Sequence, residues 1–333
     1  MKNILKYSLA FCLLFLAFHS SAQQLPLYSQ YKNNGFLINP AMAGYDGYTS
    51  LNVTARKQWV GFTDAPFTYS ASLQTRLMRK SYSIINRPAK SNRLSQSTRG
   101  RVGLGGFVFS DVNGLVSRTG VQMTYAYHIF MYKSQLSFGL AGQMFQYKID
   151  QERISTYSEL AQMGRDPLVE SNLNFVAFIP DATFGVFWTS PEFYLGFSAN
   201  QLFQSYLKLG STALGNLKLY RHYYLMGGYR FINEGNGFDL EPSFLFKSTE
   251  QFLPQADLTL KLYYRTDYWI GSSYRTNGTL AAMFGVRADK VYIGYAYDYA
   301  LSAIRKYNFG SHEIFVSLKF GDDARRYRWL NRY

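Results

Sequence analysis

The sequence predicts an all-β protein, a transmembrane antiparallel β-barrel of about 14 strands with an N-terminal plug-like segment. Three observations predict it: an N-terminal secretory signal, apolar residues at every second position, and many aromatic residues without a long apolar run after residue 22. Aromatic residues make up 18% of the chain, charged residues make up 17%, and mean hydropathy is −0.18. A barrel accounts for these values, because its strands are apolar on the lipid side only and carry aromatic girdles at both membrane interfaces.

The segment 1–22 has the features of a cleavable signal peptide. It combines a basic start, an apolar run from Leu9 to Phe18, and small residues at Ser20 and Ala22. The run holds about ten residues, too few to span a membrane as a helix at roughly 1.5 Å per residue. The only cysteine, Cys12, lies in this run, and we interpret it as a passive apolar residue in preference to a lipidated one. Cleavage then leaves a mature chain without a disulfide or thiolate metal site.

The segment 23–48 precedes the first expected strand and contains the turn sequence Asn39-Pro40-Ala41-Met42-Ala43-Gly44. Pro40 fixes its own φ and biases Asn39 toward an extended conformation, which indicates a turn. Such a segment can be a periplasmic tail or a plug folded into the lumen. We favour the plug, because a barrel of this size would otherwise enclose an open lumen.

The segment 49–320 shows the alternation of membrane strands. In the last strand, apolar Ile314, Val316 and Leu318 alternate with polar Glu313 and Ser317, and a period of two indicates a strand with two different faces. The same alternation, bounded by turn residues, predicts strands at 50–58, 67–79, 101–110, 117–131, 134–147, 181–189, 192–200, 220–231, 237–248, 255–266, 267–275, 279–288, 289–299 and 311–320. An even number of strands returns both termini to one side of the membrane.

The connections between these strands predict the orientation of the barrel. Bacterial barrels have short periplasmic turns and longer outer loops. From a periplasmic N-terminus, the short connections fall at 132–134, 190–192, 233–236, 266–267 and 289, and the long ones at 148–180, 201–219 and 300–310.

Two basic segments fall on the expected periplasmic side. The connection 80–100 is long and contains Arg87, Lys90 and Arg93 but no acidic residue, and the chain ends in a basic tail at 321–333. Either segment can be solvated and without a partner, which is usual for a charge run. The alternative is a surface that contacts an acidic periplasmic partner.

The sequence offers no catalytic, cofactor-binding or metal-binding constellation. His128, His222 and His312 fall on three different expected strands, without the spacing of a zinc site. His312 and Glu313 are neighbours in a strand, so their side chains point to opposite faces and cannot form a nucleophile set with Ser311. The net charge of +14 comes without a nucleic-acid-binding motif, and interfacial Lys and Arg can instead contact outer-membrane lipid phosphates, so no nucleic-acid partner is expected.

Seven short islands, in order along the chain, together resemble one known family. They are Gln30-Tyr31; Asn39-Pro40-Ala41-Met42-Ala43-Gly44; Arg56-Lys57-Gln58-Trp59-Val60-Gly61-Phe62 with Ala65-Pro66; Gln255-Ala256-Asp257-Leu258; Trp269-Ile270-Gly271-Ser272-Ser273-Tyr274-Arg275; Gly294-Tyr295-Ala296-Tyr297-Asp298-Tyr299; and Gly310-Ser311-His312-Glu313-Ile314. The ordered set resembles the PorP/SprF membrane proteins of the type IX secretion system of Bacteroidetes. The extension after Phe320 departs from the expected end of the last strand.

The resemblance implies a non-enzymatic component of protein export in the outer membrane of a Gram-negative bacterium. It implies contacts with other type IX secretion proteins, such as a periplasmic ring or linker protein, and in some members with a specific secreted adhesin used in gliding. A second function remains open: a passive channel or transporter for small apolar compounds. Asn39-Pro40-Ala41 also resembles the hatch turn of fatty-acid transport barrels, and the expected lumen is rich in Tyr.

Overall fold

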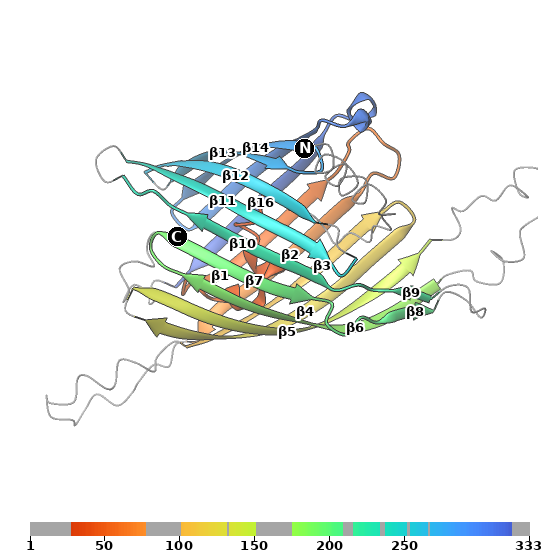
Figure 1. The fold of residues 1–333 in the computed structure, drawn as a ribbon, viewed down its shortest axis with the longest axis horizontal. Helices are drawn as coiled ribbons and strands as arrows, with labels where there is room; N and C mark the ends of the chain where they lie inside the picture. The colour runs from red at the N-terminus through yellow and green to blue at the C-terminus, as the bar shows by residue number, and fades with distance from the viewer. Residues whose placement is uncertain are drawn as a thin grey trace, which may run out of the picture.

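The computed structural model describes residues 28–77, 101–131, 133–150, 175–208, 216–233, 237–251, 254–265 and 267–321. Within these ranges, strands in chain order form a closed antiparallel barrel (Figure 1). They are β1 (Thr49–Lys57), β2 (Phe67–Leu77), β3 (Val102–Asn113), β4 (Val116–Met131), β5 (Ser134–Ile149), β6 (Phe175–Thr189), β7 (Phe193–Asn200), β10 (His222–Tyr229), β11 (Phe238–Thr249), β12 (Gln255–Tyr264), β13 (Tyr268–Arg275), β14 (Thr279–Ala288), β15 (Val291–Ala300) and β16 (Ser311–Phe320). This confirms the predicted fourteen-stranded barrel.

The barrel closes between its first and last strands. Strand β1 pairs with β16 along its whole length, from Thr49 opposite Phe320 to Lys57 opposite His312. Closure removes the free edges that a sheet would otherwise expose, which is why every backbone group in the membrane can be paired between strands.

Two expectations about the strands are wrong. Strand β6 begins at Phe175, earlier than the predicted 181, and its first part pairs with the far end of β5, where Pro180 lies opposite Met144. Proline argues against a strand from sequence alone, because it cannot donate to the ladder. The segment 201–219, predicted to be a loop, contains a separate two-stranded sheet of β8 (Tyr206–Lys208) and β9 (Asn216–Lys218).

The alternation of the strands produces two faces with different chemistry. In β16, Ile314 and Phe320 are exposed on the outside, whereas Glu313 and Ser317 are buried in the lumen. The outer face is a belt of exposed apolar side chains, which is the surface that lipid covers. No helix in the described ranges is long and apolar enough to cross a membrane.

The two ends of the barrel differ in their connections. At one end, here called the short-turn end, β4 joins β5, β6 joins β7, β12 joins β13 and β14 joins β15 within a few residues. The opposite, long-loop end carries the β8–β9 sheet and the connection with η3 (Ala303–Tyr307). It also has two short turns, after β3 and after β13, which the predicted pattern of long outer loops did not include.

The segment 28–48 lies inside the barrel, as the predicted plug does (the red segment in Figure 1). It contains a single helical turn, α2 (Gly35–Ile38), followed by the 3₁₀ turn η1 (Pro40–Met42). Met42 packs in a buried cluster with Phe187 and Met226 from the wall. Two clusters of buried hydrophobic residues therefore lie between plug and wall.

Several predicted features lie outside the described residues. They are the signal segment 1–22, the residues Arg87, Lys90 and Arg93 of the β2–β3 connection, and the tail after Gly321. They stay predictions.

We predict that a charge on the outer face is tolerated at the membrane interface but not within the belt. Phe284, in the middle of β14, and Tyr268, the first residue of β13, are similarly exposed, at 59% and 57%. Phe284→Arg should lower the free energy of unfolding in lipid vesicles by about 2–4 kcal/mol, and Tyr268→Arg by about 0–1 kcal/mol. Urea titration of both variants measures this difference, and equal losses would contradict the assigned membrane depth.

Candidate functional site

A cluster of buried charges holds the start of the plug against the wall. We call it the anchor cluster and define it by its wall residues, Arg56 of β1, Lys247 of β11, Asp257 of β12, Arg275 of β13, Asp298 of β15 and Glu313 of β16. These residues come from distant parts of the sequence, and their strands bring them together in the long-loop half of the lumen. The plug residues Ser29 and Gln30 complete it.

Arg56 is the centre of the anchor cluster. Its guanidinium donates to Asp298 at 2.6 Å and to Glu313 at 2.9 Å, and all three side chains are almost completely buried. It also donates to the hydroxyl of Ser29 at 2.9 Å. Charge-assisted bonds of this kind are the strong ones in a protein interior.

The plug backbone binds to the same carboxylates. Glu313 accepts from the main-chain N–H of Ser29 at 2.7 Å and of Gln30 at 3.0 Å, and the Ser29 hydroxyl donates to Asp298 at 2.7 Å. The plug thus supplies donors that the wall lacks. Because buried carboxylates are costly unless every lone pair finds a donor, this contact fixes the plug position.

The other half of the anchor cluster balances the charge. Arg275 donates to Asp257 at 3.1 Å and lies 3.6 Å from Asp298, and Lys247 lies 3.6 Å from Asp257. Three cations therefore face three carboxylates. A neutral set of this kind can be buried, whereas any single member could not.

The turn Asn39-Pro40-Ala41 is the second point of attachment. The Asn39 amide donates to the carbonyls of Val186 in β6, at 2.9 Å, and Phe197 in β7, at 3.2 Å, and its side-chain oxygen accepts from the Ala41 N–H at 2.9 Å. The side chain therefore shapes the turn and binds it to the wall at the same time.

Glycines in the wall make room for this turn. A Cβ at Gly139 in β5 would lie 2.2 Å from the Ala41 nitrogen, and one at Gly185 in β6 would lie 2.1 Å from the Asn39 side-chain oxygen. The backbone of the plug therefore touches the backbone of the wall. These two contacts cannot be predicted from the sequence, because a strand glycine indicates a close approach but not which group approaches.

The end of the plug rests on β2 and β4. His128 Nε2 lies 3.1 Å from the Ala43 carbonyl and its Nδ1 2.8 Å from the Ser137 hydroxyl, so this histidine is a buried structural residue. Gly44 has φ +64, and a Cβ there would meet the Thr75 carbonyl at 2.7 Å. Only glycine fits this position without strain.

The plug also carries a buried tyrosine. Tyr31 shares a hydrogen bond of 2.9 Å with the Ser243 hydroxyl, and burial raises the pKa of its hydroxyl to about 12. It therefore stays neutral at any physiological pH.

A further group of motif residues joins two connections at the long-loop end. The Val60 N–H donates to the Gly310 carbonyl at 2.8 Å, and the Phe309 N–H donates back to Val60 at 2.7 Å. Gly61 and Gly310 both have positive φ, 110° and 83°, which favours glycine there. Next to them, the Trp59 N–H donates to Ser311 and the Gln58 N–H to Pro66.

The remaining motif residues divide between the two faces. Trp269 and Gly271 face the lumen, whereas Tyr274 and Tyr299 are exposed on the outside. His312 also lies on the outer face, where its Nδ1 is 2.6 Å from the Tyr295 hydroxyl and its ring meets the edge of Tyr297. His312 and Glu313 are therefore on opposite sides of the wall, and they do not act on one site.

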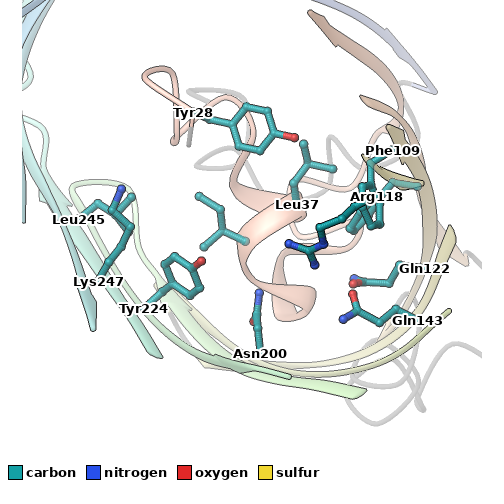
Figure 2. Close-up of a pocket in the computed structure, with 12 residues that line it drawn as sticks. Tyr28, Leu37, Phe109, Arg118, Gln122, Gln143, Asn200, Tyr224, Leu245 and Lys247 are labelled. Carbon is teal, nitrogen blue, oxygen red and sulfur yellow. The ribbon is translucent and has the colours of Figure 1, made fainter. Parts of the chain in front are cut away.

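The plug separates two cavities in the lumen. The long-loop cavity, of about 70 Å³, lies between the plug residues Tyr28 and Leu37 and the wall residues Arg118 and Lys247 (Figure 2). The short-turn cavity, of about 120 Å³, is lined by Lys32, Asn33, Gly35, Phe36, Met42, Tyr45, Asp46, Asn52, Gln74, Arg230, Tyr263, Trp269, Arg287, Tyr292, Phe315, Ser317 and Lys319. Within the described ranges, no three His, Cys, Asp or Glu side chains are grouped as metal ligands.

Comparison with known proteins gives one family. Residues 20–318 match the family described as type IX secretion system membrane protein PorP/SprF. No curated protein matches the sequence. Among solved structures, outer membrane protein Omp33 of Acinetobacter baumannii is similar with 10% identity and a TM-score of 0.41 over 83% of this chain and 99% of that one. KdgM porin is similar with 9% identity and a TM-score of 0.34 over 82% of this chain and 99% of its own.

We predict that breaking the anchor cluster strongly destabilises the protein. Arg56→Met leaves Asp298 and Glu313 buried without their main partner, which should cost about 3–5 kcal/mol in the free energy of unfolding. The control is Arg221→Met, since the Arg221–Glu250 pair is partly exposed and such pairs contribute at most about 1 kcal/mol. Urea unfolding in detergent micelles compares them, and similar losses would show that the cluster does not stabilise the fold.

We also predict that a larger side chain in place of one wall glycine displaces the plug. Gly139→Val collides with the Ala41 backbone, whereas Gly142→Val, on the outer face of the same strand, meets nothing within 4 Å. The first variant should raise the ion conductance of the barrel in planar bilayers at least about tenfold, because a displaced plug opens a fourteen-stranded lumen. The second should conduct like the wild type. Unchanged conductance of the folded Gly139→Val variant would contradict the contact between Gly139 and the plug backbone.

Proposed function

Because the chain belongs to the PorP/SprF family of type IX secretion system membrane proteins, we propose that it is a non-enzymatic outer-membrane component of protein export that works through protein–protein contacts. Its role is to support the export or surface attachment of secreted proteins such as gliding adhesins. The family match spans plug and barrel, and this is the observation that carries the proposal. We propose that the protein lies in the outer membrane of a Gram-negative bacterium, which its barrel fold supports.

The chemistry of the lumen supports a scaffold in preference to an enzyme. The charged residues of the anchor cluster bind one another and the plug, so they are not available to a substrate. His128, which is deep in the lumen, is held by Ser137 and by the Ala43 carbonyl. A barrel whose polar groups hold its own plug is suited to presenting its ends to other proteins.

The short-turn end is the proposed periplasmic end. The β2–β3 connection begins after Leu77 and ends before Val102 at this end, and its sequence contains Arg87, Lys90 and Arg93. These cations are the proposed contact for an acidic periplasmic partner, such as a ring or linker protein of the secretion machine. Complementary charge mainly speeds association and orients partners.

A second candidate function is a passive channel or transporter for small apolar compounds. The long-loop cavity supports it, because apolar Leu37, Ile38, Phe107 and Leu245 line much of it. Against it, the cavity holds only about 70 Å³ and the plug lies across the lumen. Flux through the purified barrel in liposomes distinguishes the functions: rapid passage of small apolar solutes favours the channel, and a sealed barrel favours the scaffold.

We predict that deleting the gene abolishes surface delivery of type IX substrates and that the wild-type gene restores it. The triple variant Arg87→Ala, Lys90→Ala, Arg93→Ala should reduce recovery of the periplasmic partner from native membranes about tenfold, which corresponds to about 1.4 kcal/mol of lost contact. The control removes Arg221, Arg305 and Lys306, three cations at the long-loop end. Quantitative mass spectrometry of the co-purified proteins measures recovery.

Two outcomes would count against the proposal. Normal export in a deletion strain without a second family member would exclude a role in secretion. Equal recovery from the triple variant and its control would show that the basic connection is only solvated.

A further inference from the structure

The long-loop cavity is lined by cations without a carboxylate. The described residues of its lining include Lys247 and Arg118 but no aspartate or glutamate. Lys247 belongs to the anchor cluster, where it lies 3.6 Å from Asp257. The charge of Arg118, on β4, is therefore the one that the lining leaves without a counter-ion.

Arg118 is the strongest sign that this cavity binds an anion. Its side chain is only 9% exposed, and its Nε has no hydrogen-bond acceptor among the described residues. Its guanidinium points from the wall into the cavity (Figure 2). A buried charge without a partner is costly, and such groups in native proteins mark places where an ion or water is bound.

Two carboxylates attract Arg118 from a distance. Asp111, opposite Arg118 in the β3–β4 ladder, accepts from the Thr68 hydroxyl at 2.6 Å. Asp181 accepts from two main-chain N–H groups, at 2.7 Å and 3.1 Å. Within the described part of the chain, neither forms an ion pair with Arg118. They lower the cost of burying its charge, but they leave its donors free for a ligand.

Aromatic rings of the wall hold the guanidinium in position. Its central carbon lies 4.8 Å from the centre of the Phe145 ring. A Cβ at Gly120 would lie 2.5 Å from the Phe145 Cβ and 2.9 Å from the Phe109 ring, so this glycine makes room for both rings. An aromatic face attracts a cation without cancelling its charge. The guanidinium is therefore oriented and still able to bind an anion.

The rest of the lining suits an anion with an apolar end. The Tyr224 hydroxyl and the Asn200 side chain point toward the same space as Arg118 (Figure 2). The apolar part of the lining comprises Leu37, Ile38, Phe107 and Leu245. Inorganic phosphate is polar on every side and cannot use this apolar surface. A carboxylate with a hydrocarbon end uses both parts, and its two oxygens match the planar fork of an arginine.

The volume of the cavity limits the length of that hydrocarbon end. The cavity holds about 70 Å³, whereas a protein cavity of about 150 Å³ binds benzene. Roughly half that volume accommodates about three to five non-hydrogen atoms, which is the size of acetate or propionate. A fatty acid or a lipid is too large.

We propose that the long-loop cavity binds a short-chain monocarboxylate such as acetate or propionate, whose carboxylate pairs with Arg118 and whose apolar end contacts Leu37 and Phe107. Tyr28 and Leu37 belong to the plug, so the ligand bridges plug and wall. It therefore stabilises the docked plug, since a ligand that binds only the folded state favours that state. The site lies inside the lumen and does not depend on the export role proposed above.

The test uses the full-length protein, refolded into detergent micelles in the presence of propionate so that entry into the lumen does not limit binding. Equilibrium dialysis with radiolabelled propionate measures the dissociation constant. Arg118→Gln should weaken binding at least about tenfold, as expected for one lost charge-assisted contact. The matched control is Arg221→Gln, which removes a cation that pairs with Glu250 outside the cavity. It should leave binding unchanged.

Propionamide, which has the shape of propionate without its charge, tests the unchanged protein. It should bind at least about tenfold more weakly than propionate. This comparison decides the question even if Arg118→Gln does not fold. Saturating propionate should also raise the midpoint of thermal unfolding of the wild type but not that of folded Arg118→Gln.

Four results would overturn the inference. The first is that the wild-type protein does not bind propionate. The second is equal binding of propionate and propionamide. The third is unchanged affinity of folded Arg118→Gln. The fourth is binding of inorganic phosphate or chloride as tight as that of propionate, which would make the cavity a site for any small anion.

Discussion

The rest of the structure depends on the ion pairs between Arg56 and the carboxylates Asp298 and Glu313. A barrel lumen is lined with polar groups, and any part of it that is shielded from water must satisfy those groups internally. Here the plug supplies the missing donors through Ser29 and Gln30. Once these bonds fix the start of the plug, the Asn39 turn fixes its middle, and the position of both cavities follows.

Much of this fold could be predicted from sequence. Alternation identifies strands and faces, because the side-chain period of a strand is two, and Pro40 marked the plug turn. The alternation does not identify which residues meet across the lumen, since these contacts depend on the strand order, the register and the closure of the barrel. The pairing of Arg56 with Glu313, the contact of Gly139 with Ala41 and the position of Lys261 over Trp269 needed the structure. The start of β6 could not be predicted because Pro180 cannot donate a hydrogen bond to the ladder, which argues against a strand from sequence alone. The neighbouring strand β5 nevertheless pairs with this part of β6.

The two halves of the lumen differ in electrostatics. In the long-loop half, the anchor cluster balances three cations with three carboxylates, and the adjoining cavity is partly apolar. In the short-turn half, Lys261 lies over the Trp269 ring and Arg287 over the Tyr292 ring. The plug therefore lies between two cavities with different linings.

The anchor cluster also constrains the order of assembly. Arg56 is on the first strand of the barrel, Glu313 is on the last, and Ser29 precedes both in the chain. These groups meet only across the seam where β1 joins β16. The bonds of Ser29 to both Arg56 and Glu313 can therefore form only when β1 and β16 lie side by side. The start of the plug cannot reach its final position before the seam is paired.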